Sequence, residues 1–531
     1  MRLQSSLSSF NEAEASLFQE KRMSKVDEAT LDLDKQLRAD VKSMGTLLGK
    51  TIKHFAGEDI FDTVEKLRQA AKVCTNKCSI SILSLTAFTD LILCMKKHPT
   101  SFIFSKAWRE AGAGRDPSKK NACDSAFQSM AKLSTSLTSE ELLVVSRAFT
   151  HFCAIANAAE YHHRSRRNQY DVRASALAGD TVGAFPSKPD SCGGVLPALM
   201  KRGDASAKEI YDSLVSQQVE LVLTAHPTEV NRKTLLEKHR RVQLLLTQAD
   251  EERLKGRPTP FQEAEINDKL EREIGLIWQS DELSRSKPTV QAEAERGTLV
   301  IETVLWEAIP NFMRKLDATM KCSLGEKYGL PLDAAPFKIS SWMGGDRDGN
   351  PNVTPNVTRE VCLRNRIRAA TLIKADLADI TGRLSTTFCN DEVRAKVGDV
   401  REPYRAVLYP MIDKLDLTIE WANQELKMLK GEPVSGSTVD IQDVYLSKQE
   451  VLNELFTIHK SLCDTGNALT AGGKVKNLIH KLCAFGLTLV PLDVRQESTR
   501  HTEALDAITR YLGQGELITL FVSFHSTYTS I

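Results

Sequence analysis

Three short apolar runs, at residues 219–224, 337–342 and 487–494, interrupt a chain that is otherwise patterned for amphipathic helices. Polar, chemically capable side chains follow each run at once. This order predicts parallel strands that feed loops at their carboxyl ends, where β/α folds place their binding and catalytic groups. The runs therefore favour a helix-rich α/β fold in which a small parallel sheet carries the site.

The rest of the sequence predicts two regions joined by a linker. Apolar residues three and four positions apart, set between charged ones, predict helices. These helices include residues 34–55, 60–72, 138–164 and 267–282. A stretch rich in glycine and proline at 179–201 predicts a linker. We therefore expect an N-terminal helical region over residues 1–178 and a second region over residues 202–516.

The composition disfavours several classes of partner. The 531 residues hold 70 Lys and Arg against 69 Asp and Glu, so the chain has no strong field for nucleic acid or an anionic membrane. An apolar stretch at 79–94 contains Asp90 and is shorter than the ~18–20 residues that span a bilayer. The N-terminus has no signal or transit pattern, and the cysteines form no C-x-x-C pair. The sequence predicts a cytoplasmic protein without nucleic-acid or membrane partners.

A histidine follows the first apolar run. His226 stands at the predicted corner between strand and helix, and Pro227 disfavours helical geometry there. An imidazole in this place can act as a general base or acid near neutral pH. The alternative is a histidine that closes the turn, with its ring nitrogens bonded to neighbours.

The second run leads into a loop that carries Gly344, Gly345, Asp346, Arg347 and Asp348. The glycines permit close approach of a ligand to the backbone, and the two carboxylates could hold a metal or orient the arginine, whose fork suits phosphate or carboxylate. An EF-hand calcium loop does not fit, because proline and valine stand where that loop needs glycine and glutamate. A purely structural turn is the alternative.

The third run ends at Arg495. A guanidinium there would meet an anion at the same sheet edge as His226. The alternative is an ion pair of Arg495 with its sequence neighbours Asp493 or Glu497.

Three extended motifs carry a family resemblance. The strings LTAHPTE at 223–229, SWMGGDRDGNPNVT at 341–354 and LDVRQESTRHTEAL at 492–505 occur in this order and resemble the phosphoenolpyruvate carboxylase family. Further similarity lies at 47–58, 159–162 and 304–310, and the resemblance runs with gaps from about residue 33 to 515. The details look more like the bacterial-type branch.

The resemblance implies a lyase that fixes carbon dioxide, converting phosphoenolpyruvate and bicarbonate to oxaloacetate and phosphate through carboxyphosphate and an enolate, and so feeding the tricarboxylic acid cycle. His226 matches the family's catalytic histidine, which takes the proton from the carboxyl group of carboxyphosphate. Arg495 matches an arginine that holds the substrate phosphate. Trp306 matches a tryptophan on the bicarbonate side, although a plain core position is the alternative. The loop 344–348 belongs to the family's active-site region.

The resemblance also implies a TIM-like β/α barrel with many extra helices, a Mg²⁺ or Mn²⁺ ion, and oligomers. The family's metal ligands, catalytic lysine and phosphate loop fall in its second half, which has no counterpart here. We therefore expect the N-terminal half of a carboxylase, inactive alone, with its metal ligands absent from this chain. Residues 77–106 and 517–531 are expected to be atypical segments. The alternative function is a truncated, non-catalytic relative that binds full-length carboxylase subunits.

Overall fold

The computed structural model describes residues 33–75, 117–177, 185–224, 232–256, 258–282, 288–347, 349–434 and 436–513. These residues divide into two units. One contains the described residues within 1–171 and 230–284, and the other those within 172–229 and 285–531. The sequence predicted a single boundary region at 179–201, whereas residues 230–284 belong to the first unit again.

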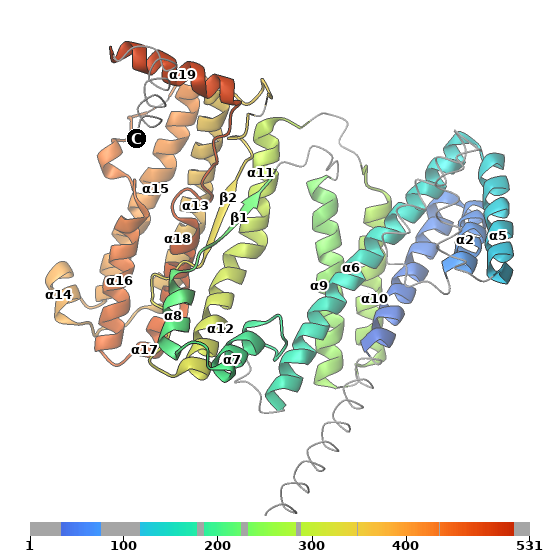
Figure 1. Ribbon diagram of the computed structural model, residues 1–531, viewed down its shortest axis with the longest axis horizontal. Helices are drawn as coiled ribbons and strands as arrows, with labels where there is room; N and C mark the ends of the chain where they lie inside the picture. Colours follow the sequence, from blue (N-terminus) through green and yellow to red (C-terminus); the bar gives the residue numbers. More distant parts are fainter. Residues whose placement is uncertain are drawn as a thin grey trace, which may run out of the picture. The chain divides into compact units, whose positions relative to one another are not determined.

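The first unit is helical (Figure 1). Its helices are a first helix over residues 33–56, α2 (Glu58–Thr75), α5 (Pro117–Ser136), α6 (Ser139–Leu177), which continues into the second unit, α9 (Lys233–Lys255) and α10 (Pro260–Trp278). The four helices predicted from periodicity are thus confirmed. One core cluster joins the first helix to α6, α9 and α10 through residues such as Met44, Ala159, Val242 and Ile274, each fully buried.

A buried ionic network crosses the same helices. Asp250 of α9 accepts hydrogen bonds from Arg166 Nε at 2.7 Å and pairs with His162 Nε2 at 2.8 Å, while Arg166 also bonds Asp40 at 2.8 Å. Burial alone would raise the pKa of Asp250, but the bonds from His162 and Arg166 outweigh it and lower that pKa to about 2. The network therefore links the first helix, α6 and α9 through charge.

Helix α6 is long and apolar enough to cross a membrane, judged by length and composition among the described helices. In its most apolar window 61% is buried within the protein. That burial is a feature of a core helix. The apolar stretch at 79–94 and the segments 77–106 and 517–531 lie outside the described residues.

The second unit packs many helices around two strands. Its elements are α7 (Cys192–Arg202), α8 (Ala207–Ser216), β1 (Val219–Leu223), α11 (Val290–Val300), a π-helical turn (Ile301–Leu305), α12 (Trp306–Leu324), β2 (Phe337–Ser341), α13 (Pro355–Arg383), α14 (Asp391–Val397), α15 (Pro403–Leu429), a 3₁₀ turn (Ile441–Asp443), α16 (Lys448–Asp464), α17 (Ala468–Thr470), a second π-helical turn (Ala471–Val475), α18 (Lys476–Phe485) and α19 (Ser498–Tyr511). The linker predicted over 179–201 thus contains most of α7, capped by Ser191.

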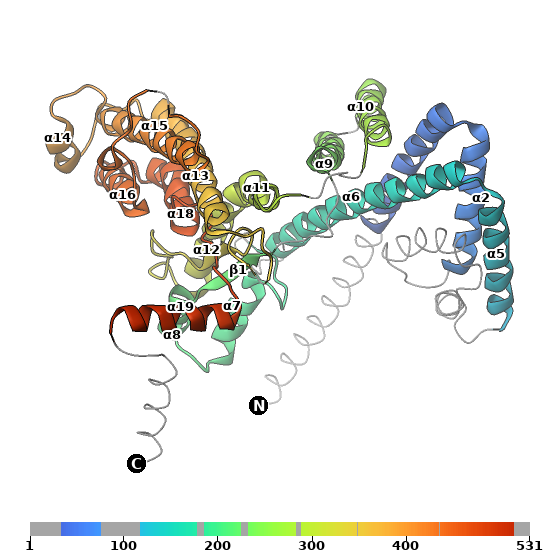
Figure 2. The same cartoon turned by 90° about the horizontal axis from the view of Figure 1, so that it is seen from above.

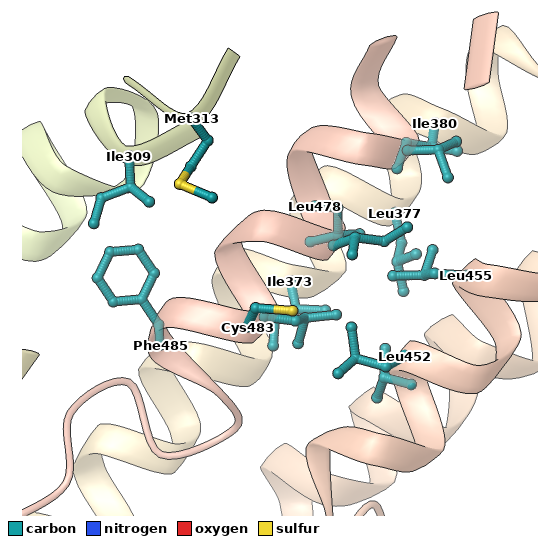
Figure 3. Close-up of a cluster of buried hydrophobic side chains, with 14 of the residues drawn as sticks. Ile309, Met313, Ile373, Leu377, Ile380, Leu452, Leu455, Leu478, Cys483 and Phe485 are labelled. Atoms are coloured by element: carbon teal, nitrogen blue, oxygen red, sulfur yellow. The ribbon is translucent and has the colours of Figure 1, made fainter. Parts of the chain in front are cut away.

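The core of this unit lies between α12, α13, α16 and α18. Figure 3 shows apolar side chains from all four helices facing one another, among them Met313, Leu377, Leu455, Leu478 and Phe485. Leu377 and Leu455 are fully buried. Burying one leucine stabilises a fold by about 1.5–3 kcal/mol, so these four helices form a rigid support for the sheet.

The two strands pair in parallel, with Val219 opposite Phe337 and Leu223 opposite Ser341. This confirms the strands predicted over 219–224 and 337–342. Figure 1 shows them side by side in the second unit. The sheet of the described residues has these two strands, and they do not form a closed barrel by themselves.

The third predicted strand is wrong over most of its length. Residues 487–490 form a turn after α18, and Leu489 in it has a φ of +58°. The sheet is joined instead by Leu492, through an isolated parallel bridge to Ser341. Leu487 and Leu489 are 3% and 0% exposed. The apolar run therefore reflects burial of a turn, which sequence alone does not distinguish from a buried strand.

Candidate active site

The carboxyl ends of the two strands and the Leu492 segment meet at one edge. The Trp342 N–H donates to the Leu223 carbonyl at 2.9 Å, and the Asp493 N–H donates to the Ser341 carbonyl at 2.9 Å. The ladder is thus continuous from β1 through β2 to the segment at Leu492. The described residues that follow the second and third of these ends lie side by side.

The ladder continues past β2 into the glycine-rich loop. The Arg495 N–H donates to the Gly345 carbonyl at 3.1 Å, and the Arg347 N–H donates to the Arg495 carbonyl at 3.0 Å. Asp346 and Arg495 form an isolated parallel bridge. The second and third candidate segments therefore touch along their backbones.

Both glycines of the loop are required by this geometry. Gly344 has a φ of +89°, and a Cβ there would lie 2.8 Å from Val361 Cγ2. A Cβ on Gly345 would lie 2.4 Å from the carbonyl oxygen of Asp493. No other residue type fits such contacts without a shift of the backbone. Gly345 thus lets the loop pack directly against the segment that carries Arg495, and Gly344 lets it pack against α13.

The Arg495 side chain pairs across the bridge with Asp346. Its Nη1 lies 3.5 Å from Asp346 Oδ2, and 49% of the Arg495 side chain is exposed. Among the described residues no ion pair joins Arg495 to Asp493 or Glu497, so the local pairing considered from sequence is wrong. A single long contact leaves most of the five guanidinium N–H donors available to a ligand.

An aromatic ring lies beside the same guanidinium. Arg495 Cζ is 4.2 Å from the centroid of the Trp342 ring. The indole Nε1–H of Trp342 donates to Asp493 Oδ2 at 3.2 Å. Trp342 and Asp493 were not selected from the sequence as site residues, and the available signal was their position at the carboxyl ends of the second and third apolar runs.

Two buried polar atoms of the loop have no hydrogen-bond partner among the residues that the structure describes. They are Asp346 Oδ1 and Arg347 Nε. Within the part of the chain that the structure describes, the Asp346 carboxylate contacts Arg495, whereas the sequence suggested that it could hold a metal or orient Arg347. Leaving a buried polar atom unpaired costs about 1–3 kcal/mol. These two atoms are therefore able to bond a ligand or another part of the protein.

Trp306 lies in the core, away from these contacts. It is 4% exposed at the start of α12, directly after the first π-helical turn. Its Nε1–H donates to Asp376 Oδ2 at 3.0 Å, and its ring stacks on Phe485 with centroids 5.3 Å apart. The buried ammonium of Lys481 bonds the same carboxylate at 2.8 Å. These contacts correspond to the core position considered as the alternative for this residue.

Two candidate residues, His226 and Asp348, lie outside the described residues. His226 comes three positions after Leu223, the last residue of β1. Within the described ranges, no group of three or more His, Cys, Asp or Glu side chains is arranged to hold a metal ion. The described residues therefore do not fit a metal site of their own.

The fold and these contacts define a helix-rich α/β protein with an accessible guanidinium at the carboxyl edge of a parallel sheet. The family model described as phosphoenolpyruvate carboxylase matches residues 105–519. The chain belongs to the phosphoenolpyruvate carboxylase family.

Curated relatives agree with this membership. The chain is 36% identical over 487 residues to a phosphoenolpyruvate carboxylase of Marinobacter nauticus, and the match covers 92% of this chain and 47% of that protein. It is 34% identical to one of Acinetobacter baylyi, with 91% and 46% covered, and 33% identical to one of Pectobacterium atrosepticum, with 90% and 47% covered. The chain thus spans about half the length of the curated relatives it matches.

Proposed function

We propose that these residues form the N-terminal half of a phosphoenolpyruvate carboxylase active site, which makes oxaloacetate and phosphate from phosphoenolpyruvate and bicarbonate. The observation that carries the proposal is the meeting of the Leu223, Trp342 and Asp493 ends at one edge, with Arg495 accessible beside them. Barrel enzymes place their chemistry at such an edge. On this proposal, β1, β2 and the Leu492 segment belong to a β/α barrel whose other strands come from the part of the relatives that this chain does not span.

In this reaction Arg495 binds the phosphate of phosphoenolpyruvate through its planar fork. Bicarbonate attacks the phosphorus, and the bond from phosphorus to the enol oxygen breaks to give carboxyphosphate and the enolate of pyruvate. His226 takes the proton from the carboxyl group of carboxyphosphate. Carbon dioxide and phosphate separate, and the enolate carbon attacks the carbon dioxide to form oxaloacetate. Trp306 would shape the bicarbonate side from the core.

The family implies Mg²⁺ or Mn²⁺, which would supply charge stabilisation of the enolate. We propose that its ligands come from the part of the relatives that this chain does not span. A cytoplasmic location and assembly into oligomers complete the proposal.

The test is oxaloacetate formation with Mg²⁺ present, followed by coupled reduction to malate. The 531-residue chain is assayed alone and together with the C-terminal half of the Marinobacter nauticus carboxylase as a separate chain. We expect no turnover alone and turnover in the mixture, lost when His226→Asn is used. Turnover that is unchanged by His226→Asn would refute the assigned role.

A second candidate function is favoured by surfaces that lack a partner among the described residues. Val219 and Leu221 of β1 are 40% and 50% exposed, and no residue of α19 is buried. Figures 1 and 2 draw α19 at the margin of the second unit. Such surfaces favour binding to another carboxylase chain. Co-purification with a full-length relative, with no turnover in any mixture, would support this non-catalytic function.

A further inference from the structure

Trp342 has no role in the proposed reaction, yet it makes the closest aromatic contact of Arg495. The 4.2 Å between Arg495 Cζ and the ring centroid is well inside the ~6 Å range of cation–π attraction. A guanidinium that stacks on an indole has its plane fixed by the ring. The exposed part of the Arg495 side chain remains available to an anion.

The indole is itself held from two sides. The main chain of Trp342 is bonded to the end of β1 through Leu223, and its Nε1–H is bonded to Asp493 Oδ2 at 3.2 Å. Asp493 in turn is bonded through its backbone to Ser341. The ring therefore cannot turn away from Arg495 without breaking its hydrogen bond to Asp493, whose backbone is held at the sheet edge.

The two acidic residues near Arg495 have different partners. Asp493 accepts the hydrogen bond of Trp342, while Asp346 makes the ion pair with Arg495 through one contact of 3.5 Å. A single contact from one guanidinium nitrogen to one oxygen does not fix the guanidinium plane, whereas the Trp342 ring lies over the whole group. A group that is already oriented loses less side-chain freedom when it binds a ligand.

We propose that Trp342, fixed by Asp493, is a positioning residue that preorganises Arg495 to bind the phosphate of phosphoenolpyruvate. This inference rests on the proposed function, because it takes Arg495 as the anion-binding group. Trp342 acts through Arg495 and does not contact the substrate. Its removal therefore affects phosphoenolpyruvate affinity through the guanidinium alone.

The test is calorimetric titration of phosphoenolpyruvate into the 531-residue chain and its variants. Trp342→Leu removes the ring and should weaken binding about threefold to thirtyfold, the range for a cation–π contact. Trp342→Phe keeps a ring and should lose less. Trp421→Leu is the matched control, since Trp421 stacks with Arg366 at 5.6 Å in the same unit. This control should bind as the unaltered chain does.

A double-mutant cycle separates positioning from a general structural effect. In an Arg495→Lys background, Trp342→Leu should change affinity by less than about twofold, because an ammonium has no plane to orient. Equal losses of affinity in both backgrounds would overturn the inference. Unchanged binding by both Trp342→Phe and Trp342→Leu would also overturn it. If the unaltered chain binds no phosphoenolpyruvate, or if Arg495→Lys binds equally well, the proposed function fails instead.

Discussion

The carboxylate of Asp346 lies 3.5 Å from the guanidinium of Arg495, although 149 positions separate them in the sequence. The contact exists because a backbone bridge joins the two residues at the carboxyl edge of the sheet. It brings together two motifs that the sequence presents far apart. Predictions for this edge and for the two helical units follow from the same contacts.

For the proposed base, His226→Asn should leave phosphoenolpyruvate binding intact and lower oxaloacetate formation about 100- to 10,000-fold, the usual effect of losing a general base. Asparagine keeps a polar side chain but cannot accept the proton. The measurement is turnover in the reconstituted mixture, with phosphoenolpyruvate affinity measured in parallel. A parallel fall in affinity would point to a structural role for the histidine.

At the loop, Gly345→Ala should lower the free energy of unfolding by about 1–3 kcal/mol, as overpacking does. The added Cβ would meet the Asp493 carbonyl at 2.4 Å. Gly382→Ala in α13 is the matched control, since a Cβ there has nothing within 4 Å. Denaturant unfolding compares the two. Equal stability of both variants would show that the loop does not need this close approach.

The pH dependence of stability should contain a term from His480. Burial, with the nearby charge of Lys476, lowers the pKa of His480 to about 4, and both of its buried ring nitrogens lack a hydrogen-bond partner within the described part of the chain. Arg314 also lowers this pKa, and Asp317 opposes the shift. Between pH 6.5, the ordinary pKa, and pH about 4, this histidine binds a proton in the unfolded chain but not in the folded chain.

The unfolding free energy should therefore fall by about 3 kcal/mol more in the unaltered chain than in His480→Phe as the pH drops from 7 to 4. Unfolding of both proteins across this range gives the difference directly and cancels the other titrating groups. Parallel curves for the two proteins would mean that His480 titrates normally in the folded state.

In the first unit, Asp250→Asn should cost about 2 kcal/mol of stability at pH 7, because the lowered pKa of Asp250 reflects bonds to its charged form. That stability is present above the ordinary pKa of 3.8 and is lost as the pH falls through about 2. Glu265→Gln, at an exposed pair with Lys269, is the control and should unfold like the unaltered chain. Equal free energies of unfolding for the two variants would contradict a stabilising network.

Local patterns predicted the local structure. Helical periodicity predicted a helix at 138–164, which overlaps α6 from Ser139 onward, and the runs predicted at 219–224 and 337–342 contain β1 and β2. The run ending at 494 was misread because a buried turn and a buried strand share the same composition.

The partners of Arg495 could not be predicted from the sequence. Local reasoning offered Asp493 and Glu497, whereas the register of the bridge selected Asp346 and Trp342. Which residues a parallel edge brings together depends on register and on the length of the connecting turn, and neither is written in the motifs. The motifs did indicate that both segments belong to one site.

The central claim is that the edge carrying Arg495 binds phosphoenolpyruvate. Titration of phosphoenolpyruvate into the unaltered chain and into Arg495→Lys tests it most directly, because lysine keeps the charge but not the planar fork. We predict saturable binding to the unaltered chain and an affinity about tenfold lower for the variant, the loss of about one charge-assisted hydrogen bond. Absence of binding, or equal affinity of the two proteins, would contradict the claim.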